Sequence, residues 1–109
     1  MKIEQFYNKN QFLIYNKGEY YLQSYESTVA KIDSDHNLIL GSDWDYSNTT
    51  RKHLYLFIND YIELIKPCQR ELLKELNSKQ NKRKYIESLI NNNIIKCVCG
   101  DVEWVVGSW

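Results

Sequence analysis

The stretch WDYSNTTRKH, residues 44–53, lies where the hydrophobic pattern of the chain changes. Before it, the chain consists of short apolar segments separated by turn-forming residues, which is typical of β-strands. After it, apolar residues recur at spacings of three and four, which is typical of one face of a helix. These residues are Leu54, Phe57, Ile58, Tyr61, Ile62 and Ile65. The stretch therefore divides an extended half of the chain from a helical one.

The extended half predicts four or five antiparallel strands before residue 42. Asn8-Lys9-Asn10 and Lys17-Gly18 are plausible tight turns between the first three segments, and the short polar side chains of residues 33–36 favour another turn. The segments are KIEQFY (2–7), QFLIYN (11–16), EYYLQSYE (19–26), TVAKID (28–33) and NLILG (37–41). Their order predicts an antiparallel meander.

The helical half predicts two or three helices. Pro67 is expected to end the first, because proline disfavours a helical conformation in the preceding residue. A second pattern includes Leu72, Leu73 and Leu76, and a third runs through residues 85–90 and stops at residues 91–93, which are three asparagines.

The last segment, IIKCVCGDVEWVVGSW (94–109), reads as two strands about Gly100-Asp101, a pair suited to a hairpin turn. Strands, then helices, then strands predict an α+β fold. We expect one domain over residues 1–109, in which the N-terminal meander and the C-terminal hairpin form an antiparallel sheet with the helices packed on one face.

The charge of the chain is balanced overall but unevenly distributed. The formal net charge of the 109 residues is zero, which argues against a general electrostatic attraction to nucleic acid or to an anionic membrane. Residues 1–46 hold four Lys against seven Asp or Glu, a net charge of −3, and residues 47–109 hold ten Lys or Arg against seven acids, a net charge of +3. Acidic and basic partners are therefore expected to bind different faces.

Three cysteines, Cys68, Cys97 and Cys99, are too few for a secreted disulfide framework. No apolar run approaches the ~20 residues that span a bilayer. We therefore expect a cytoplasmic protein without a membrane partner. Cys97-x-Cys99 with Cys68 and either His53 or His36 could supply four zinc ligands, but structural zinc sites usually separate paired cysteines by two to four residues. Buried cysteines are the simpler interpretation, so no metal is expected.

No cofactor and no enzymatic activity are expected. The chain has no nucleophile elbow, no glycine-rich phosphate loop and no metal-binding His pair on a helix. A nucleophilic pair of Cys68 and His53 stays open, because such pairs meet only in the folded structure.

The opening stretch combines helix capping with unfavourable charge. Its hydroxyl and amide side chains can accept hydrogen bonds from the unpaired amides of a helix start. Arg51, Lys52 and His53, however, bring cations to the positive end of the helix dipole. Two explanations stay open: Asp43 and Asp45 fold back to pair with them, or the site binds an anion such as a phosphate or an acidic protein surface. The candidate partner-binding residues are Trp44, Asp45, Tyr46, Thr49, Thr50, Arg51, Lys52 and His53.

A second basic cluster follows about thirty residues later, at Lys79, Lys82, Arg83 and Lys84. It is either a solvated helix start or a phosphate-binding patch. If it lies beside residues 49–53 in the fold, the two would form one basic surface, on which exposed tyrosines could stack with bases.

The segments LQSYESTVAKID (22–33) and LILGSDWDYSNTTRKHLYLFINDY (38–61) resemble a family of small uncharacterised domains encoded by bacteriophages and prophages of low-GC Gram-positive bacteria. The shared pattern is an LQSY strand followed by WDYSxTTxKH, and the similarity covers roughly residues 20–62. No catalytic residues are assigned to that family. The resemblance implies a phage or mobile-element setting in a bacterial host cell.

These observations favour a phage-encoded, non-catalytic binding protein. Our leading hypothesis is an inhibitor of a host defence system, of the anti-CRISPR kind, which occupies a host protein or a protein–RNA surface. In one variant the acidic residues mimic phosphates and fill a nucleic-acid channel; they are Glu19, Glu26, Asp33, Asp35, Asp43 and Asp45. The alternative is an accessory protein that binds RNA or single-stranded DNA.

Overall fold

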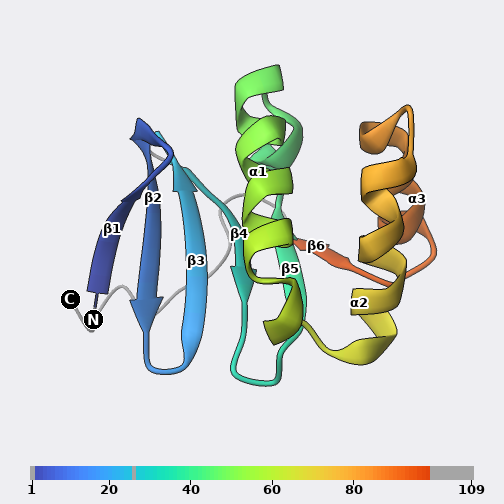
Figure 1. The fold of residues 1–109 in the computed structure, drawn as a ribbon, viewed down its shortest axis with the longest axis horizontal. Coiled ribbons are helices and arrows are strands. Elements are labelled where there is room, and N and C mark those ends of the chain that lie inside the picture. Colours follow the sequence, from blue (N-terminus) through green and yellow to red (C-terminus); the bar gives the residue numbers. More distant parts are fainter. Residues whose placement is uncertain (1, 26, 99–109) are drawn as a thin grey trace.

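The computed structural model describes residues 2–25 and 27–98, without the side chains of residues 8–10. Its extended half is a meander of five antiparallel strands (Figure 1). They are β1 (Lys2–Phe6), β2 (Asn8–Asn16), β3 (Glu19–Ser24), β4 (Ser27–Ile32) and β5 (Leu38–Gly41). The helical half then crosses one face of the sheet and returns as β6 (Lys96–Val98), which pairs in parallel with β5. The α+β fold is thus confirmed, with one parallel pair at the sheet edge.

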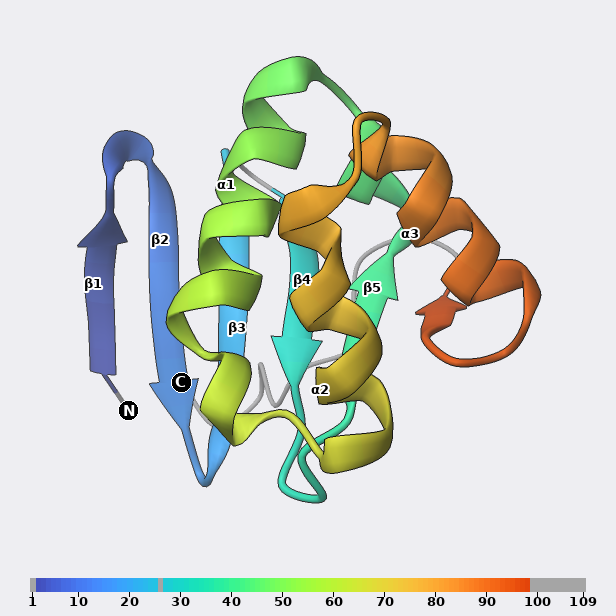
Figure 2. The ribbon, with the colours of Figure 1, turned by 45° about the vertical axis from the view of Figure 1, so that its right-hand side comes forward.

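Three helices cover the sheet on one face, and α1 and α2 lie in front of β3, β4 and β5 (Figure 2). The helices are α1 (Asn48–Asp60), α2 (Pro67–Lys74) and α3 (Lys82–Asn91), and shorter 3-10 turns are η1 (Ser42–Asp45), η2 (Ile62–Leu64) and η3 (Glu75–Ser78). The core lies between the two layers. Leu22 of β3, Leu40 of β5 and Phe57 of α1 are all fully buried in it.

Residues with positive φ close several turns. Lys17 (φ 52) and Gly18 (φ 81) form the predicted turn between β2 and β3, a pair of left-handed residues that matches the twist of a hairpin. Asn93 (φ 60) follows the last helical turn of α3, as the run of asparagines predicts.

The first turn is not where the sequence placed it. Asn8-Lys9-Asn10 belongs to β2, and the reversal occurs at Tyr7 (φ 62), so that Phe6 pairs directly with Asn8. A single left-handed residue reverses the chain here, and the register between β1 and β2 shifts between Gln5 and Phe6.

The first helix is shorter than predicted, and Pro67 does not end it. Helix α1 stops at Asp60, because Tyr61 leaves the helical region (φ −114, ψ 20), and η2 follows. A 3-10 turn also repeats every three residues, so it keeps Ile65 in the core. Pro67 is the first residue of α2, where its missing amide hydrogen costs nothing.

The predicted C-terminal hairpin is only partly visible. Its first strand corresponds to β6, whereas Gly100-Asp101 and the second strand lie outside the described residues. Among those described, no helix is long and apolar enough to cross a bilayer.

Candidate functional site

The opening stretch forms the junction between the sheet and α1. The chain leaves β5 through η1 and enters α1 at Ser47, whose extended backbone (φ −154, ψ 168) marks the N-cap. The Ser47 hydroxyl accepts a hydrogen bond from the amide of Thr50 at 3.1 Å. Of Ser47, Asn48, Thr49 and Thr50, only Ser47 is therefore the cap; Asn48 accepts a hydrogen bond from Arg51, and Thr50 bonds to Ser47 and Ser24.

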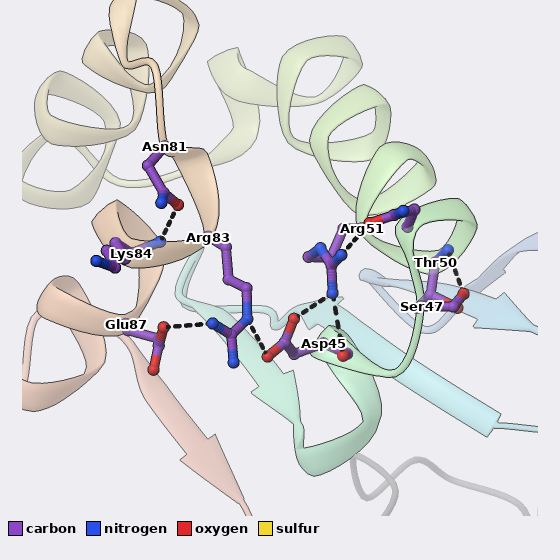
Figure 3. A network of polar contacts seen from close by, with 9 residues as sticks. Asp45, Ser47, Thr50, Arg51, Asn81, Arg83, Lys84 and Glu87 are labelled. Atoms are coloured by element: carbon purple, nitrogen blue, oxygen red, sulfur yellow. Dashed lines mark hydrogen bonds and ion pairs between the residues drawn. The ribbon is translucent and has the colours of Figure 1, made fainter.

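Asp45 offsets the unfavourable charge at this helix start. Its carboxylate pairs with Arg51 of α1 at 2.5 Å and with Arg83 of α3 at 2.6 Å (Figure 3). Arg51 also donates to the Asn48 side chain. The Asp45 contact raises the pKa of Arg83, because its hydrogen bond favours the charged guanidinium. The carboxylate of Asp45, folded back from η1, thus compensates the positive charge that Arg51 brings to the N-terminus of α1.

Three of the eight predicted partner-binding residues are buried. Trp44 is 5% exposed, Thr50 2% and His53 5%. Trp44 belongs to the core, and His53 Nδ1 lies 2.8 Å from the backbone carbonyl of Thr49 within α1. Trp44 and His53 therefore shape the junction from inside, and a partner could not contact these two side chains directly in this conformation.

The other five reach the surface. Tyr46 is 79% exposed, Thr49 and Lys52 are exposed, and Asp45 and Arg51 are partly exposed. The predicted site is therefore narrowed from eight residues to five.

The second basic cluster lies beside the first. Arg51 and Lys52 of α1 and Lys82 of α3 line one groove of about 390 Å³. Asn48, Tyr55, Leu56, Asn59 and Asn77 complete its lining. Asn59 and Asn77 exchange two side-chain hydrogen bonds, at 3.0 and 3.1 Å, which tie α1 to η3 across the groove.

We call the joined surface the basic junction and define it as Arg51, Lys52, Lys82, Arg83 and Lys84. Two carboxylates, Asp45 and Glu87, pair with Arg51 and Arg83 of this set, so the five residues together carry an excess of positive charge. Within the part of the chain that the structure describes, Lys52 and Lys84 form no ion pair. Lys79 lies to one side, with its ammonium 4.8 Å from the centre of the Tyr85 ring.

A second, larger depression lies on the other side of the α1 N-terminus and was not predicted. This hydroxyl cleft has a volume of about 740 Å³. Its lining residues are Ser24, Tyr25, Ser27, Val29, Asp43, Tyr46, Ser47, Thr49 and Thr50. Tyr46, Thr49 and Thr50 of this lining are among the predicted partner-binding residues. The sequence carries no signal for the other wall, because Ser24 and Ser27 come from the β3–β4 hairpin and meet α1 only in the folded chain.

The acidic residues of the phosphate-mimic variant do not gather on one surface. Asp33 and Asp35 lie in the turn before β5, whereas Asp43 and Asp45 follow its other end. Glu19 is 3.9 Å from Lys31 and accepts a hydrogen bond from Tyr21. Glu26 is outside the described residues.

The described residues contain no group of three His, Cys, Asp or Glu side chains that could hold a metal ion. Cys68 is exposed at the start of α2, and Cys97 is partly buried in β6 with its thiol 3.8 Å from the carbonyl of Gly41. Cys99 lies outside the described residues.

Residues 1–88 match the model of a family described as a family of unknown function, DUF8033. The chain belongs to DUF8033. The matched part spans β1 to β5, α1 and α2 and most of α3, so every residue of the basic junction lies in the DUF8033 region. No curated protein and no solved structure matches the chain.

Proposed function

We propose that this protein is a non-catalytic binding protein that uses the basic junction to bind an anionic partner. The observation that supports this proposal is the meeting of two basic segments, about thirty residues apart in sequence, at one groove. The groove also lies at the N-termini of α1 and α3, where helix dipoles add positive potential. Asp45 neutralises part of this charge, and the rest is available to a partner.

The partner class we favour is a host protein–RNA surface. The resemblance of residues 20–62 to phage and prophage domains suggests that the protein acts in an infected bacterium. A small binding protein in that setting would serve a phage by blocking a host defence complex, stoichiometrically and without chemistry. Basic side chains would then occupy a phosphate-bearing or acidic part of that complex.

The second candidate function is direct binding of RNA or single-stranded DNA. The groove favours it because cations stand next to an aromatic residue, Tyr55, and to the amides of Asn48 and Asn77. Single-strand binders combine such charges with aromatic and polar groups.

Capture from infected host cells tests the proposal. The tagged protein is compared with a Lys52→Glu, Lys82→Glu variant, which reverses two charges of the groove. A matched control, Lys17→Glu with Lys96→Glu, makes the same charge change at the β2–β3 turn and in β6. We expect one stoichiometric partner with the wild type and the control, and its loss with the groove variant. A folded groove variant that retains the partner would contradict the proposal.

Salt separates the two candidate functions. Nucleic acid held through phosphates is released steeply between low and high salt, because bound counterions compete with the protein. A host protein complex that survives the same wash favours the inhibitor, whereas salt-labile nucleic acid without a protein favours the second candidate.

A further inference from the structure

The hydroxyl cleft lies between the end of the β3–β4 hairpin and the first turn of α1. Its volume of about 740 Å³ falls in the range of small-molecule sites. Ser24 and Thr50 line it although they are only 4% and 2% exposed. Buried polar side chains in a cleft are costly unless they are hydrogen-bonded, so the way these two are paired bears on what the cleft binds.

The hydroxyl groups at the base of this cleft are hydrogen-bonded to one another. Ser24 lies 3.3 Å from the Thr50 hydroxyl, and Ser47 donates to Thr50 at 3.1 Å. Behind Ser24, Gln11 donates to the Ser24 hydroxyl at 2.9 Å, and its own Oε1 is buried without a partner. Gln11 does not line the cleft, so it fixes the Ser24 hydroxyl from the core side.

The chemistry of the cleft selects against a phosphate and for a neutral ring. Asp43 lines it with a carboxylate, which accepts a hydrogen bond from Ser27 at 3.0 Å and repels anions. Tyr46 and Tyr25 supply rings that are 79% and 52% exposed. Exposed aromatic faces beside mixed donors and acceptors suit a flat ligand with hydrogen-bonding edges, as a nucleobase is.

The neighbouring groove indicates what that ring is attached to. Ser47 and Thr49 line the hydroxyl cleft, whereas Asn48, Arg51 and Lys52 line the groove of the basic junction. The first turn of α1 therefore lies between the cleft and the groove. We propose that the hydroxyl cleft binds a base of a single-stranded nucleic acid whose phosphates lie on the basic junction. The inference rests on the second candidate of the proposed function, direct binding of a single-stranded nucleic acid by the basic junction.

An abasic probe tests the cleft separately from the groove. Fluorescence anisotropy compares an oligouridine of about 12 nucleotides with an abasic ribose-phosphate chain of the same length, which carries the same charge. Oligodeoxythymidine distinguishes RNA from DNA as the source of the base. We expect the wild type to bind the base-bearing strand about tenfold more tightly than the abasic one, since stacking of one base contributes that much.

Variants of Tyr46 assign the preference to the cleft. Tyr46→Ala should bring the ratio of the affinities for oligouridine and for the abasic chain close to one, by weakening only the binding of oligouridine. Tyr46→Phe keeps the aromatic ring and should retain the wild-type ratio. Tyr7→Ala removes a 63% exposed tyrosine that bonds to Asp60 at the far end of α1, and serves as the control. Equal binding of both strands by the wild type would overturn the base site while the basic junction stands. No binding of either strand would also overturn it, and capture of a protein partner would then decide the proposed function.

Discussion

At the scale of single residues, Asp45 contributes most to the arrangement of the site. It lies in η1, and its carboxylate contacts an arginine from each of two helices that begin far apart in the sequence. Because one carboxylate serves both guanidiniums, Asp45 fixes the start of α3 beside the start of α1.

The sequence could indicate the ion pairing but not which acid provides it. Asp43 and Asp45 are two residues apart, and both lie within eight residues of Arg51 in the sequence. In the 3-10 turn they point to different sides of the junction, so Asp43 lines the hydroxyl cleft and Asp45 meets Arg51. Choosing between them requires the backbone path of η1, which no residue pattern specifies.

Gln69 provides a residue-scale prediction about the fold. It is 4% exposed, accepts from the Leu38 amide at 2.8 Å and donates to the Ile94 carbonyl at 2.8 Å. Gln69→Leu leaves both backbone groups buried without a partner, so we expect a loss of about 3 kcal/mol of unfolding free energy in urea. Gln23→Leu, which removes an exposed hydrogen bond, is the control and should cost less than about 1 kcal/mol. Equal losses would refute the bridging role.

At the scale of elements, the two helices of the junction begin in the same way. Ser47 caps α1 by accepting from Thr50, and Asn81 caps α3 by accepting from Lys84 at 3.1 Å. Both caps are short polar residues in front of a basic first turn. The sequence predicted the start of α1 at the stretch of residues 44–53 and the apolar pattern of α3 over residues 85–90, but it did not identify Asn81 as a cap. It extended α1 beyond Asp60, because a 3-10 turn keeps the same apolar spacing.

Removing one cap should weaken its helix. We expect Ser47→Ala to lower the unfolding free energy by about 1 kcal/mol, as is typical for loss of an N-cap. Ser47→Asp retains an acceptor and should restore most of that stability. Thermal unfolding followed by circular dichroism measures both. A Ser47→Asp protein no more stable than Ser47→Ala would show that the cap contributes little.

Tyrosines packed along the helices give the fold a dependence on alkaline pH. Burial raises the pKa of Tyr55, Tyr61 and Tyr85 above the ordinary 10.0. The unfolded chain therefore ionises first, so their contribution to stability is complete below pH 10 and is lost as the pH rises through and beyond that value. Urea unfolding at increasing pH should show this loss, and Tyr55→Phe should reduce it. An unchanged Tyr55→Phe protein would contradict the assignment.

At the scale of the whole molecule, the fold brings together two basic segments that are separate in the sequence, at the starts of α1 and α3. The class, the meander and the positions of α1 and α3 followed from local patterns. Local patterns did not predict three further features: the parallel pairing of β6, the groove shared by Lys52 and Lys82, and the hydroxyl cleft. Each of these depends on how the helices cross the sheet. The sequence therefore identified both basic segments, but it could not predict whether they lie side by side in the fold.

The most direct test of the basic junction is the affinity and stability of an Asp45→Asn protein. A loss of binding can follow from structural damage, whereas a gain cannot. Asp45→Asn should cost about 1 kcal/mol of unfolding free energy, since the ion pairs are partly exposed, and should bind the captured partner more tightly, because Arg51 and Arg83 are no longer neutralised. Titration of that partner against both proteins at one salt concentration measures the change. A folded Asp45→Asn protein that binds with equal or lower affinity would contradict the account.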